Sequence, residues 1–248
     1  VLSHKNALKA MLTLGFSFGG FFIIIAKSSF IYIEHFKISN DFFGDILLKY
    51  LIENGVETNY SPRSSAPTTL AFVSLPNNDG DDEPQYAFYA NDSADRSLTE
   101  SELPRHISDS VKALHFGSIS LAMEPGATSL ETLMKRESRK RIISLDPNIR
   151  SGLIQDRDAY RQRFMQWIKH IDIIKLSQAD LSWIYPDEDA DQIIEQWFDE
   201  GISLCILTLG SEGAKGFIPT GKSVFVPTLQ VEIADTVGAG DSFLAATL

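Results

Sequence analysis

Apolar residues recur at helical spacing between Asp41 and Asn54, and this periodicity predicts the first clear helix of the chain. Asn40 is suited to cap its start, and Gly55 is suited to end it. Two shorter apolar runs, Thr69–Leu75 and Tyr86–Tyr89, follow with a polar, turn-rich loop between them. Because no helix separates these two runs, they predict a β-hairpin.

The pattern changes at about Val111, where short apolar runs begin to alternate with amphipathic helical stretches. This alternation is typical of βαβ units and predicts an α/β fold with a doubly wound, mostly parallel sheet sandwiched by helices. In such sheets ligands bind beyond the carboxyl ends of the strands. The predicted strands are Ala113–Phe116, Ile142–Leu145, Ile171–Leu176 and Leu204–Thr208, and the predicted helices are Ser129–Arg139, Arg157–Lys169 and Asp191–Phe198.

The predicted hairpin is too polar at its turn, and too isolated from helices, to belong to this central sheet. We therefore expect a single domain over residues 1–248 that carries a small β-sheet lid, built from about residues 10–20 and 66–96. Phe72, Phe88 and Tyr89 would give the lid an apolar face. Such a face favours burial against a second copy, so the lid is a candidate homodimer contact.

Composition narrows the class of protein further. The chain has 248 residues, of which 44% are hydrophobic and 22% charged, so it is long and apolar enough for one large folded domain. Its formal net charge of -11 argues against a nucleic-acid binder, which needs a basic face. The single cysteine, Cys205, lies in the apolar run Ile202–Leu207, where we expect a buried structural thiol and a reducing, cytoplasmic compartment.

One uncharged stretch, Ala10–Ala26, has the composition of a short membrane span or a signal peptide. Its length of about 17 residues is the lower limit for a span. Gly15, Gly19 and Gly20 interrupt it, and no clear cleavage site follows. We therefore expect a buried strand, a glycine turn and the start of a core helix here, and no membrane association.

The most specific chemical signal is the heptad Asp235–Asp241, in which a Gly-Ala-Gly turn leads into a helix predicted to begin near Ala239 or Gly240. Glycines let successive backbone N–H groups converge, and the positive helix end adds to their attraction for an anion. A carboxylate beside such a site, here Asp241, is suited to take a proton from an attacking hydroxyl. An ordinary glycine turn with Asp241 as a helix-start residue is the alternative.

The segment Asp235–Phe243 resembles the C-terminal signature of the PfkB family of carbohydrate kinases, whose fold is ribokinase-like. The resemblance extends over about Lys37–Leu248. It implies that Asp241 is the base that activates a sugar hydroxyl. It also implies phosphoryl or phosphate contacts at Gly238, Ala239, Gly240, Asp235 and Thr236.

Three further segments resemble motifs of the same family. Leu145–Arg150 resembles an Asp-x-Asn-x-Arg element, Thr208–Gly213 resembles a Thr-x-Gly-x-x-Gly nucleotide loop, and Lys175–Asp180 resembles a fructokinase-type Asn-x-x-Glu element with Ser and Asp substituted. From the residues alone, helix caps, surface residues or an ordinary strand–turn–strand remain open for these segments. The resemblance implies nucleotide or phosphate contacts at Asn148, Arg150, Lys175, Ser177, Thr208, Gly210 and Gly213, and a magnesium contact at Asp180.

Other segments resemble the fructokinase-like branch of the family, which includes 2-keto-3-deoxygluconate kinases. These segments are Pro67–Val73, Tyr86–Tyr89 and Ala94–Arg96. An ordinary ion pair between Asp95 and Arg96 in a solvated loop is the alternative for the last of them. The resemblance implies substrate contacts at Gly19, Gly20, Phe88, Arg96 and Asp241.

The N-terminal part departs from the family pattern. Family members begin with Gly-Glu-x-x-x-Asp and continue with Gly-Gly-x-x-x-Asn, whose Asp and Asn bind sugar hydroxyls. Ala10 and Ile24 stand at those positions here, and neither side chain can supply the hydrogen bonds. The chain also stops at Leu248, early in the helix after the glycine turn, where relatives continue. A degenerate homologue, a truncated product and wrongly assigned flanks each account for these departures.

The predicted function is ATP-dependent phosphorylation of a sugar hydroxyl, with ATP and Mg²⁺ as cofactors. Fructose is the first expected substrate, followed by 2-keto-3-deoxygluconate or another small polyol, and then by nucleosides. A non-catalytic homologue that binds nucleotide or protein partners is the alternative, because of Ala10 and Ile24. An NAD-binding Rossmann protein is excluded, because no Gly-x-Gly-x-x-Gly follows a first strand.

Overall fold

The computed structural model describes residues 42–74, 85–229 and 237–248. The chain divides into two compact units, and the described parts of the smaller unit are residues 42–55, 67–74, 85–93 and 237–248. The larger unit comprises residues 56–66 and 94–229. Several predicted features lie outside the described residues: the Asn40 cap, the stretch Ala10–Ala26 with Gly19 and Gly20, the departures at Ala10 and Ile24, and the residues Asp235 and Thr236.

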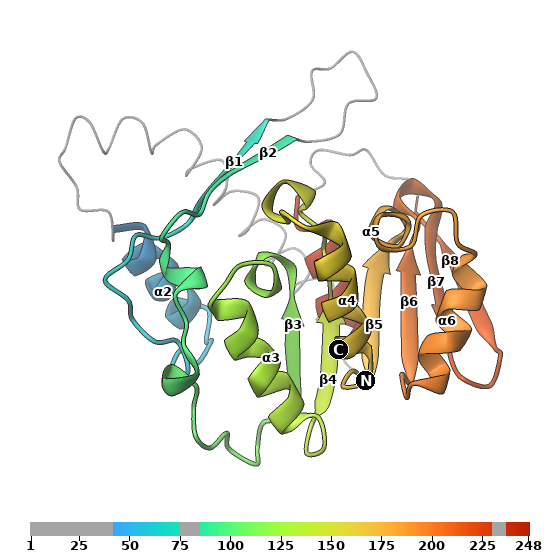
Figure 1. The fold of residues 1–248 in the computed structure, drawn as a ribbon, viewed down its shortest axis with the longest axis horizontal. Helices are drawn as coiled ribbons and strands as arrows, with labels where there is room; N and C mark the ends of the chain where they lie inside the picture. The colour runs from blue at the N-terminus through green and yellow to red at the C-terminus, as the bar shows by residue number, and fades with distance from the viewer. Residues whose placement is uncertain (1–41, 75–84, 230–236) are drawn as a thin grey trace. The chain divides into compact units, whose positions relative to one another are not determined.

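A six-stranded sheet forms the centre of the larger unit (Figure 1). The strands lie side by side in chain order. The first four are parallel to one another, the fifth is antiparallel to the fourth, and the sixth is antiparallel to the fifth. This arrangement confirms the predicted α/β class with a mostly parallel sheet. The strands are β3 (Ala113–Gly117), β4 (Ile142–Asp146), β5 (Ile173–Ser177), β6 (Leu204–Thr208), β7 (Gly213–Phe217) and β8 (Ser223–Pro227).

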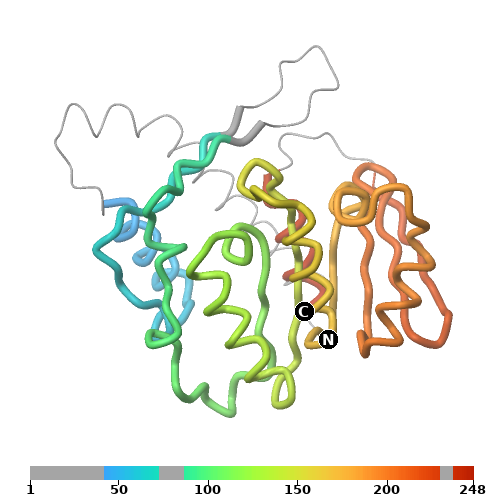
Figure 2. Tube along the Cα trace, viewed as in Figure 1, coloured from blue at the N-terminus to red at the C-terminus, as the bar shows by residue number. Residues whose placement is uncertain are grey.

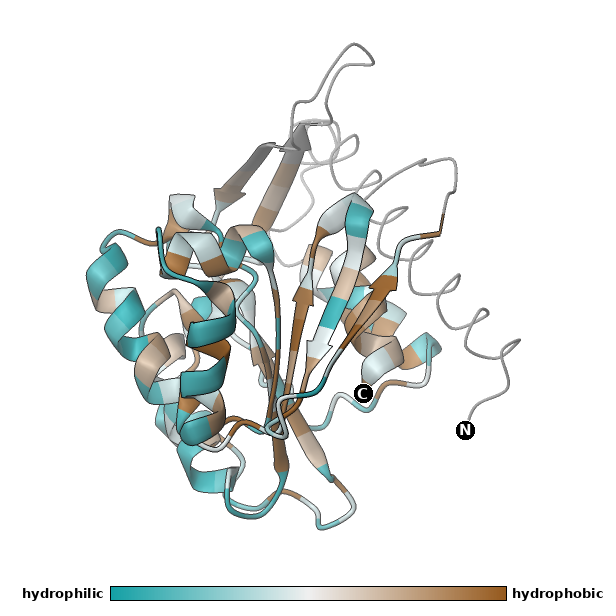
Figure 3. Cartoon of the chain, turned by 90° about the vertical axis from the view of Figure 1, so that its right-hand side faces the viewer, coloured by the Kyte–Doolittle hydropathy of each residue, from teal (hydrophilic) through white to brown (hydrophobic). Residues whose placement is uncertain are grey.

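Helices connect the parallel strands, and α3, α4 and α6 lie on the same face of the sheet (Figures 1 and 3). Side-chain caps explain where three of the helices begin, because Asp156, Ser177 and Asp189 each accept a hydrogen bond from a backbone N–H of the first turn. The helices are α3 (Gly126–Glu137), α4 (Arg157–Ile168), α5 (Gln178–Ile184) and α6 (Ala190–Asp199), with short 3₁₀ helices at Ala94–Arg96, Glu100–Glu102, Ser118–Leu121, Ser151–Leu153 and Gly210–Glu212.

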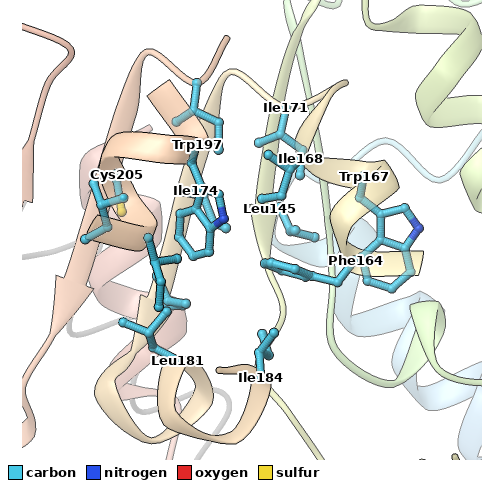
Figure 4. Close-up of a cluster of buried hydrophobic side chains, with 14 of the residues drawn as sticks. Leu145, Phe164, Trp167, Ile168, Ile171, Ile174, Leu181, Ile184, Trp197 and Cys205 are labelled. Carbon is cyan, nitrogen blue, oxygen red and sulfur yellow. The ribbon is translucent and has the colours of Figure 1, made fainter. Parts of the chain in front are cut away.

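The main hydrophobic core lies between this sheet face and the helices that cover it (Figure 4). Phe164 and Trp167 of α4 and Trp197 of α6 supply aromatic rings, and Ile174 of β5 lies among them, completely buried. Consecutive residues of β4, from Ile143 to Asp146, are all buried, as expected for a parallel strand with both faces covered. The sheet is therefore a rigid support for whatever its carboxyl ends present.

In its described residues the smaller unit contains the predicted hairpin and two helices. The strands β1 (Leu70–Ser74) and β2 (Gln85–Tyr89) pair antiparallel in a sheet of their own, which confirms a β-hairpin separate from the main sheet. Helix α2 (Phe42–Glu53) is followed by Gly55 with a φ of 77°, the conformation expected where glycine ends a helix. The last helix, α7 (Ala239–Thr247), begins where the glycine turn predicted it.

The predicted elements that lie within the described residues agree with the structure to within about three residues, and Figure 2 traces the alternation of strand and helix. Apart from the 3₁₀ helices, α5 and β8 have no counterpart in the prediction, and β7 was anticipated only by the strand–turn–strand alternative for Thr208–Gly213. Helix α5 is short and begins directly after β5, so no polar loop separates them. β7 is rich in glycine, which disfavours strands. Within the described ranges, no helix is long and apolar enough to cross a membrane.

Cys205 is completely buried in β6, as predicted, and burial raises the pKa of its thiol to about 12. Thiolate is the reactive form, and at pH 8 only about one thiol in 10⁴ would carry the charge. We expect the folded protein to resist a chromogenic disulfide reagent at pH 8 for hours, and the denatured protein to react within minutes. Fast reaction of the folded protein would contradict this burial.

Gly117 ends β3 at a point where the backbone of β4 comes very close. A Cβ added at this residue would lie 2.1 Å from the backbone oxygen of Asp146. We expect Gly117→Ala to lower the free energy of unfolding by about 1–3 kcal/mol or more, because the two strands must separate to admit the methyl group. Gly152→Ala is the control, since nothing lies within 4 Å of the added carbon. Equal stability of the two variants in urea denaturation would refute the close approach.

Candidate functional site

The carboxyl ends of β3, β4 and β5 meet at one edge of the main sheet, and the backbone is strained there. Ser118, directly after β3, has a φ of 56°, and Asn148, two residues after β4, has a φ of 39°. This left-handed conformation costs roughly 1–2 kcal/mol for a residue such as Ser118, whereas asparagine adopts it with less strain. Strain of this kind often marks functional sites. The edge is therefore the candidate site of the larger unit.

A buried ion pair lies at this edge. Lys175 of β5 donates a hydrogen bond to Oδ2 of Asp146 at the end of β4, over 2.7 Å. Both side chains are about 95% buried. A buried lysine needs a partner of opposite charge, and here Asp146 supplies it. Oδ1 of Asp146 accepts a second hydrogen bond, from the backbone N–H of Asn148.

A second buried carboxylate, that of Asp180, holds the neighbouring residue of the same turn. Its Oδ1 accepts from the backbone N–H of Ile149 over 2.8 Å. Its Oδ2 accepts from the N–H and the hydroxyl of Ser177, which in turn caps α5. Burial is the main cause that raises the pKa of the Tyr160 hydroxyl, and the negative charge of Asp180 adds to the effect.

Arg150 and Asn148, the two residues with predicted phosphate contacts in the turn after β4, are bound to each other. Nη1 of Arg150 donates to the Oδ1 of Asn148 over 2.7 Å and to the carbonyl oxygen of Ile149 over 3.1 Å. The guanidinium is half-buried. A cation held against its own turn in this way is pre-organised to meet an anion at the sheet edge.

The predicted nucleotide loop joins β6 to the antiparallel strand β7. Thr208 ends β6 opposite Ser177, and its hydroxyl donates weakly to the carbonyl of Leu176. Gly210 and Gly213 have φ values of 59° and 132°, which favour glycine. A Cβ on Gly213 would lie 2.1 Å from the carbonyl oxygen of Val226. The packing of β7 against β8 therefore requires glycine at this position, whether or not a ligand binds there.

The predicted anion-binding turn lies in the smaller unit. Gly238 has a φ of 79° and precedes α7, where Ala239, Gly240 and Asp241 form the first helical turn. Asp241 is exposed, so its carboxylate is accessible to a ligand. The first N–H groups of any α-helix lack partners within the helix, which makes this turn suited to an anion.

The predicted substrate residues that the structure describes are divided between the units. Phe88 is a half-buried residue of β2 in the smaller unit. Arg96 belongs to the larger unit, where its Nε donates to the carbonyl oxygen of Glu124. Its predicted sugar contact stays a prediction.

Within the larger unit the structure brings together Asn148, Arg150, Lys175, Ser177, Asp180 and Thr208 at neighbouring strand ends. Sequence reasoning missed two residues of this edge. Asp146 was part of the Asp-x-Asn-x-Arg segment but was assigned no role, and Ser118 was not considered. A glycine followed by a serine directly after a predicted strand was the available signal for the second. In the described ranges, no group of three or more acidic, histidine or cysteine side chains forms a metal cluster.

Comparison with known proteins decides the family. A family model described as "pfkB family carbohydrate kinase" matches residues 35–248. The chain belongs to this family. A fructokinase of Rhizobium leguminosarum bv. trifolii is 40% identical over 211 residues, which are 85% of this chain and 63% of that protein. Fructokinase-2 of Oryza sativa subsp. japonica is 36% identical over 86% of this chain and 63% of its own length.

Solved structures of the family have the same fold. The fructokinase of Xylella fastidiosa with bound ATP matches 82% of this chain and 63% of its own, with a TM-score of 0.73 and 28% identity. The Vibrio cholerae O395 fructokinase in its fructose, ADP and calcium-bound form matches 84% of this chain and 66% of its own, with a TM-score of 0.71 and 26% identity. The ribokinase-like fold class is thereby confirmed. The chain spans about 63% of the length of the curated relatives.

The buried ion pair at the edge has a measurable energetic signature. We expect Lys175→Met to lower the free energy of unfolding by about 3–5 kcal/mol, because it removes the ammonium group that lies 2.7 Å from the buried carboxylate of Asp146. Adding Asp146→Asn should recover part of that loss. A double-mutant cycle followed by urea denaturation measures the coupling. Additive losses in the two single variants would show that the pair does not interact.

Proposed function

We propose that this protein transfers the γ-phosphoryl group of ATP to a hydroxyl of a sugar, with fructose as the first candidate. The observation that carries the proposal is membership of the carbohydrate kinase family together with curated relatives that are fructokinases. Neighbouring structures bind ATP, or fructose and ADP. 2-Keto-3-deoxygluconate and other small polyols are the next candidates, and nucleosides are the third.

The catalytic base in this proposal is Asp241. It accepts the proton of the attacking hydroxyl, while the backbone N–H groups of the turn 238–240 hold the migrating phosphoryl group. The exposed carboxylate and the left-handed Gly238 before α7 support this assignment. Asp235 and Thr236 precede the turn and are assigned to the phosphates by resemblance.

The carboxyl edge of the main sheet is the proposed nucleotide side. Arg150 and Asn148 contact phosphate, and their mutual hydrogen bond at the turn supports a pre-organised cation there. Thr208, Gly210 and Gly213 contact the nucleotide, with Ser177 beside them. Gly19, Gly20, Phe88 and Arg96 are assigned to the sugar.

Magnesium belongs to the reaction because it neutralises phosphate charge during phosphoryl transfer. Asp180 fits poorly as a direct ligand, since its carboxylate already accepts three hydrogen bonds from protein donors. A carboxylate offers about four lone-pair sites, so only one remains. Magnesium commonly keeps several waters and is held by phosphates with one or two carboxylates. Asp180 is therefore not assigned as a magnesium ligand.

The hairpin of the smaller unit is also proposed as a homodimer contact, because Tyr89 is 66% exposed and packs edge-on against Phe72. A cytoplasmic location is also part of the proposal, and a buried free thiol at Cys205 is compatible with it.

A nucleotide-binding protein without turnover is the second candidate function. It is favoured by Ala10 and Ile24 at the sugar-binding positions of the family pattern.

Replacing the proposed base separates the two candidates. We expect Asp241→Asn to lower the rate of sugar phosphorylation by about 10²–10⁴-fold, because the amide cannot take the hydroxyl proton. The affinity for ATP should stay nearly unchanged, since the substitution is isosteric and lies at the reacting hydroxyl. Steady-state kinetics and calorimetric titration with ATP measure the two effects.

Asp158→Asn is the matched control, because Asp158 is another exposed carboxylate in the first turn of a helix, α4. It should keep full activity. Full turnover by Asp241→Asn would show that another group is the base. ATP binding by the unsubstituted protein without turnover on any sugar would favour the non-catalytic candidate.

A further inference from the structure

The turn after β4 is held by side chains that do not belong to it. Two consecutive backbone N–H groups, those of Asn148 and Ile149, donate to two different buried carboxylates. One carboxylate is at the end of β4, and the other is in the first turn of α5. The turn therefore cannot move without breaking hydrogen bonds to two elements of the core.

Both carboxylates are fixed in turn. Lys175 holds Asp146 from the neighbouring strand, and Ser177 holds Asp180 through two hydrogen bonds in a capping box. Lys175 is therefore satisfied by protein, and its Nζ is directed at Asp146. Each of the two buried carboxylates accepts more than one hydrogen bond, and leaving one unmade costs about 1–3 kcal/mol. The network therefore has one stable arrangement.

The arrangement fixes the turn in one conformation. Asn148 has a φ of 39°, in the left-handed region that asparagine adopts more readily than most residues with a side chain. With the backbone held in this way, the side-chain amide of Asn148 and the guanidinium of Arg150 meet over 2.7 Å. The two carboxylates therefore determine where the cation of the turn lies.

We propose that Asp146 and Asp180 are positioning residues, which act through the turn 147–150 to hold Arg150 for a phosphate of the nucleotide rather than by contacting nucleotide, magnesium or sugar. Lys175 serves the same purpose by fixing the carboxylate of Asp146. This inference rests on the proposed function, because it takes phosphate as the partner of Arg150. It gives the Lys175 and Asp180 positions a role different from the direct contacts that the family resemblance implies.

A double-mutant cycle between Asp180→Asn and Arg150→Ala tests the proposal in the full-length protein. If Asp180 acts through Arg150, Asp180→Asn alone should lower kcat/KM for ATP by roughly 10–100-fold, because misplacing a contact by about 1 Å has that effect. In the Arg150→Ala background, the same substitution should change kcat/KM less than about threefold. Independent effects that multiply would overturn the proposal.

The magnesium dependence distinguishes positioning from metal binding. At fixed ATP, the Mg²⁺ concentration for half-maximal rate should be the same in Asp180→Asn as in the unsubstituted protein. A several-fold higher requirement would show that Asp180 is a metal ligand.

A matched control removes loss of stability as an explanation. Glu137 is another buried carboxylate of the larger unit, and it is hydrogen-bonded by Arg136 and Arg141 at the amino end of β4. Glu137→Gln should lower the free energy of unfolding yet keep kcat/KM per folded molecule. A loss of kcat/KM as large as that of Asp180→Asn would mean that general destabilisation explains both.

Hydrogen exchange decides the proposal even without turnover. The backbone amides of Asn148 and Ile149 should exchange faster in Asp180→Asn than in the unsubstituted protein, and Glu137→Gln should leave them unchanged. If the protein phosphorylates no sugar, the proposed function fails, and this measurement still shows whether the carboxylates hold the turn. Unchanged exchange in Asp180→Asn would overturn the positioning role whatever the activity.

Discussion

The ion pair between Lys175 and Asp146 is the constraint on which the candidate site of the larger unit depends. Lys175, in the middle of β5, and Asp146, at the end of β4, are both buried, so neither side chain can rely on water for its hydrogen bonds. Lys175 instead donates to Asp146 over 2.7 Å on the neighbouring strand. The pair in turn directs the second oxygen of Asp146 at the backbone of Asn148. The ion pair thus connects the polar turn to the buried part of the sheet, and Asp180 holds the turn at the next residue.

The main elements were predictable because they follow local periodicity. The strands β3, β4 and β6 and the helices α4 and α6 lie close to their predicted bounds, since each is an apolar run or an amphipathic stretch with a cap. β7 (Gly213–Phe217) was anticipated only as an alternative, because two glycines replace the usual branched residues and its strand character comes from pairing with β6. Tertiary pairing overrides propensity at such places.

The site was only partly predictable for a different reason. Motif spacing placed Asn148 and Arg150 just after a strand and Lys175 within the next one, and the structure finds them there. The hydrogen-bond partners of these residues could not be read from the sequence. Lys175 bonds to Asp146, and Ile149 bonds to Asp180. Each pair is about 30 residues apart in the chain and meets only after the strands pair. The motif resemblance therefore implied a metal contact for Asp180, whereas its hydrogen bonds go to the backbone of Ile149 and to Ser177.

ADP release by the full-length protein with ATP, Mg²⁺ and a panel of sugars tests most directly whether this chain belongs to a protein that phosphorylates a sugar. We expect ADP release that depends on fructose or a closely related sugar, with a matching phosphorylated sugar in the ³¹P spectrum. Tight ATP binding with no sugar-dependent ADP release across the panel would contradict it.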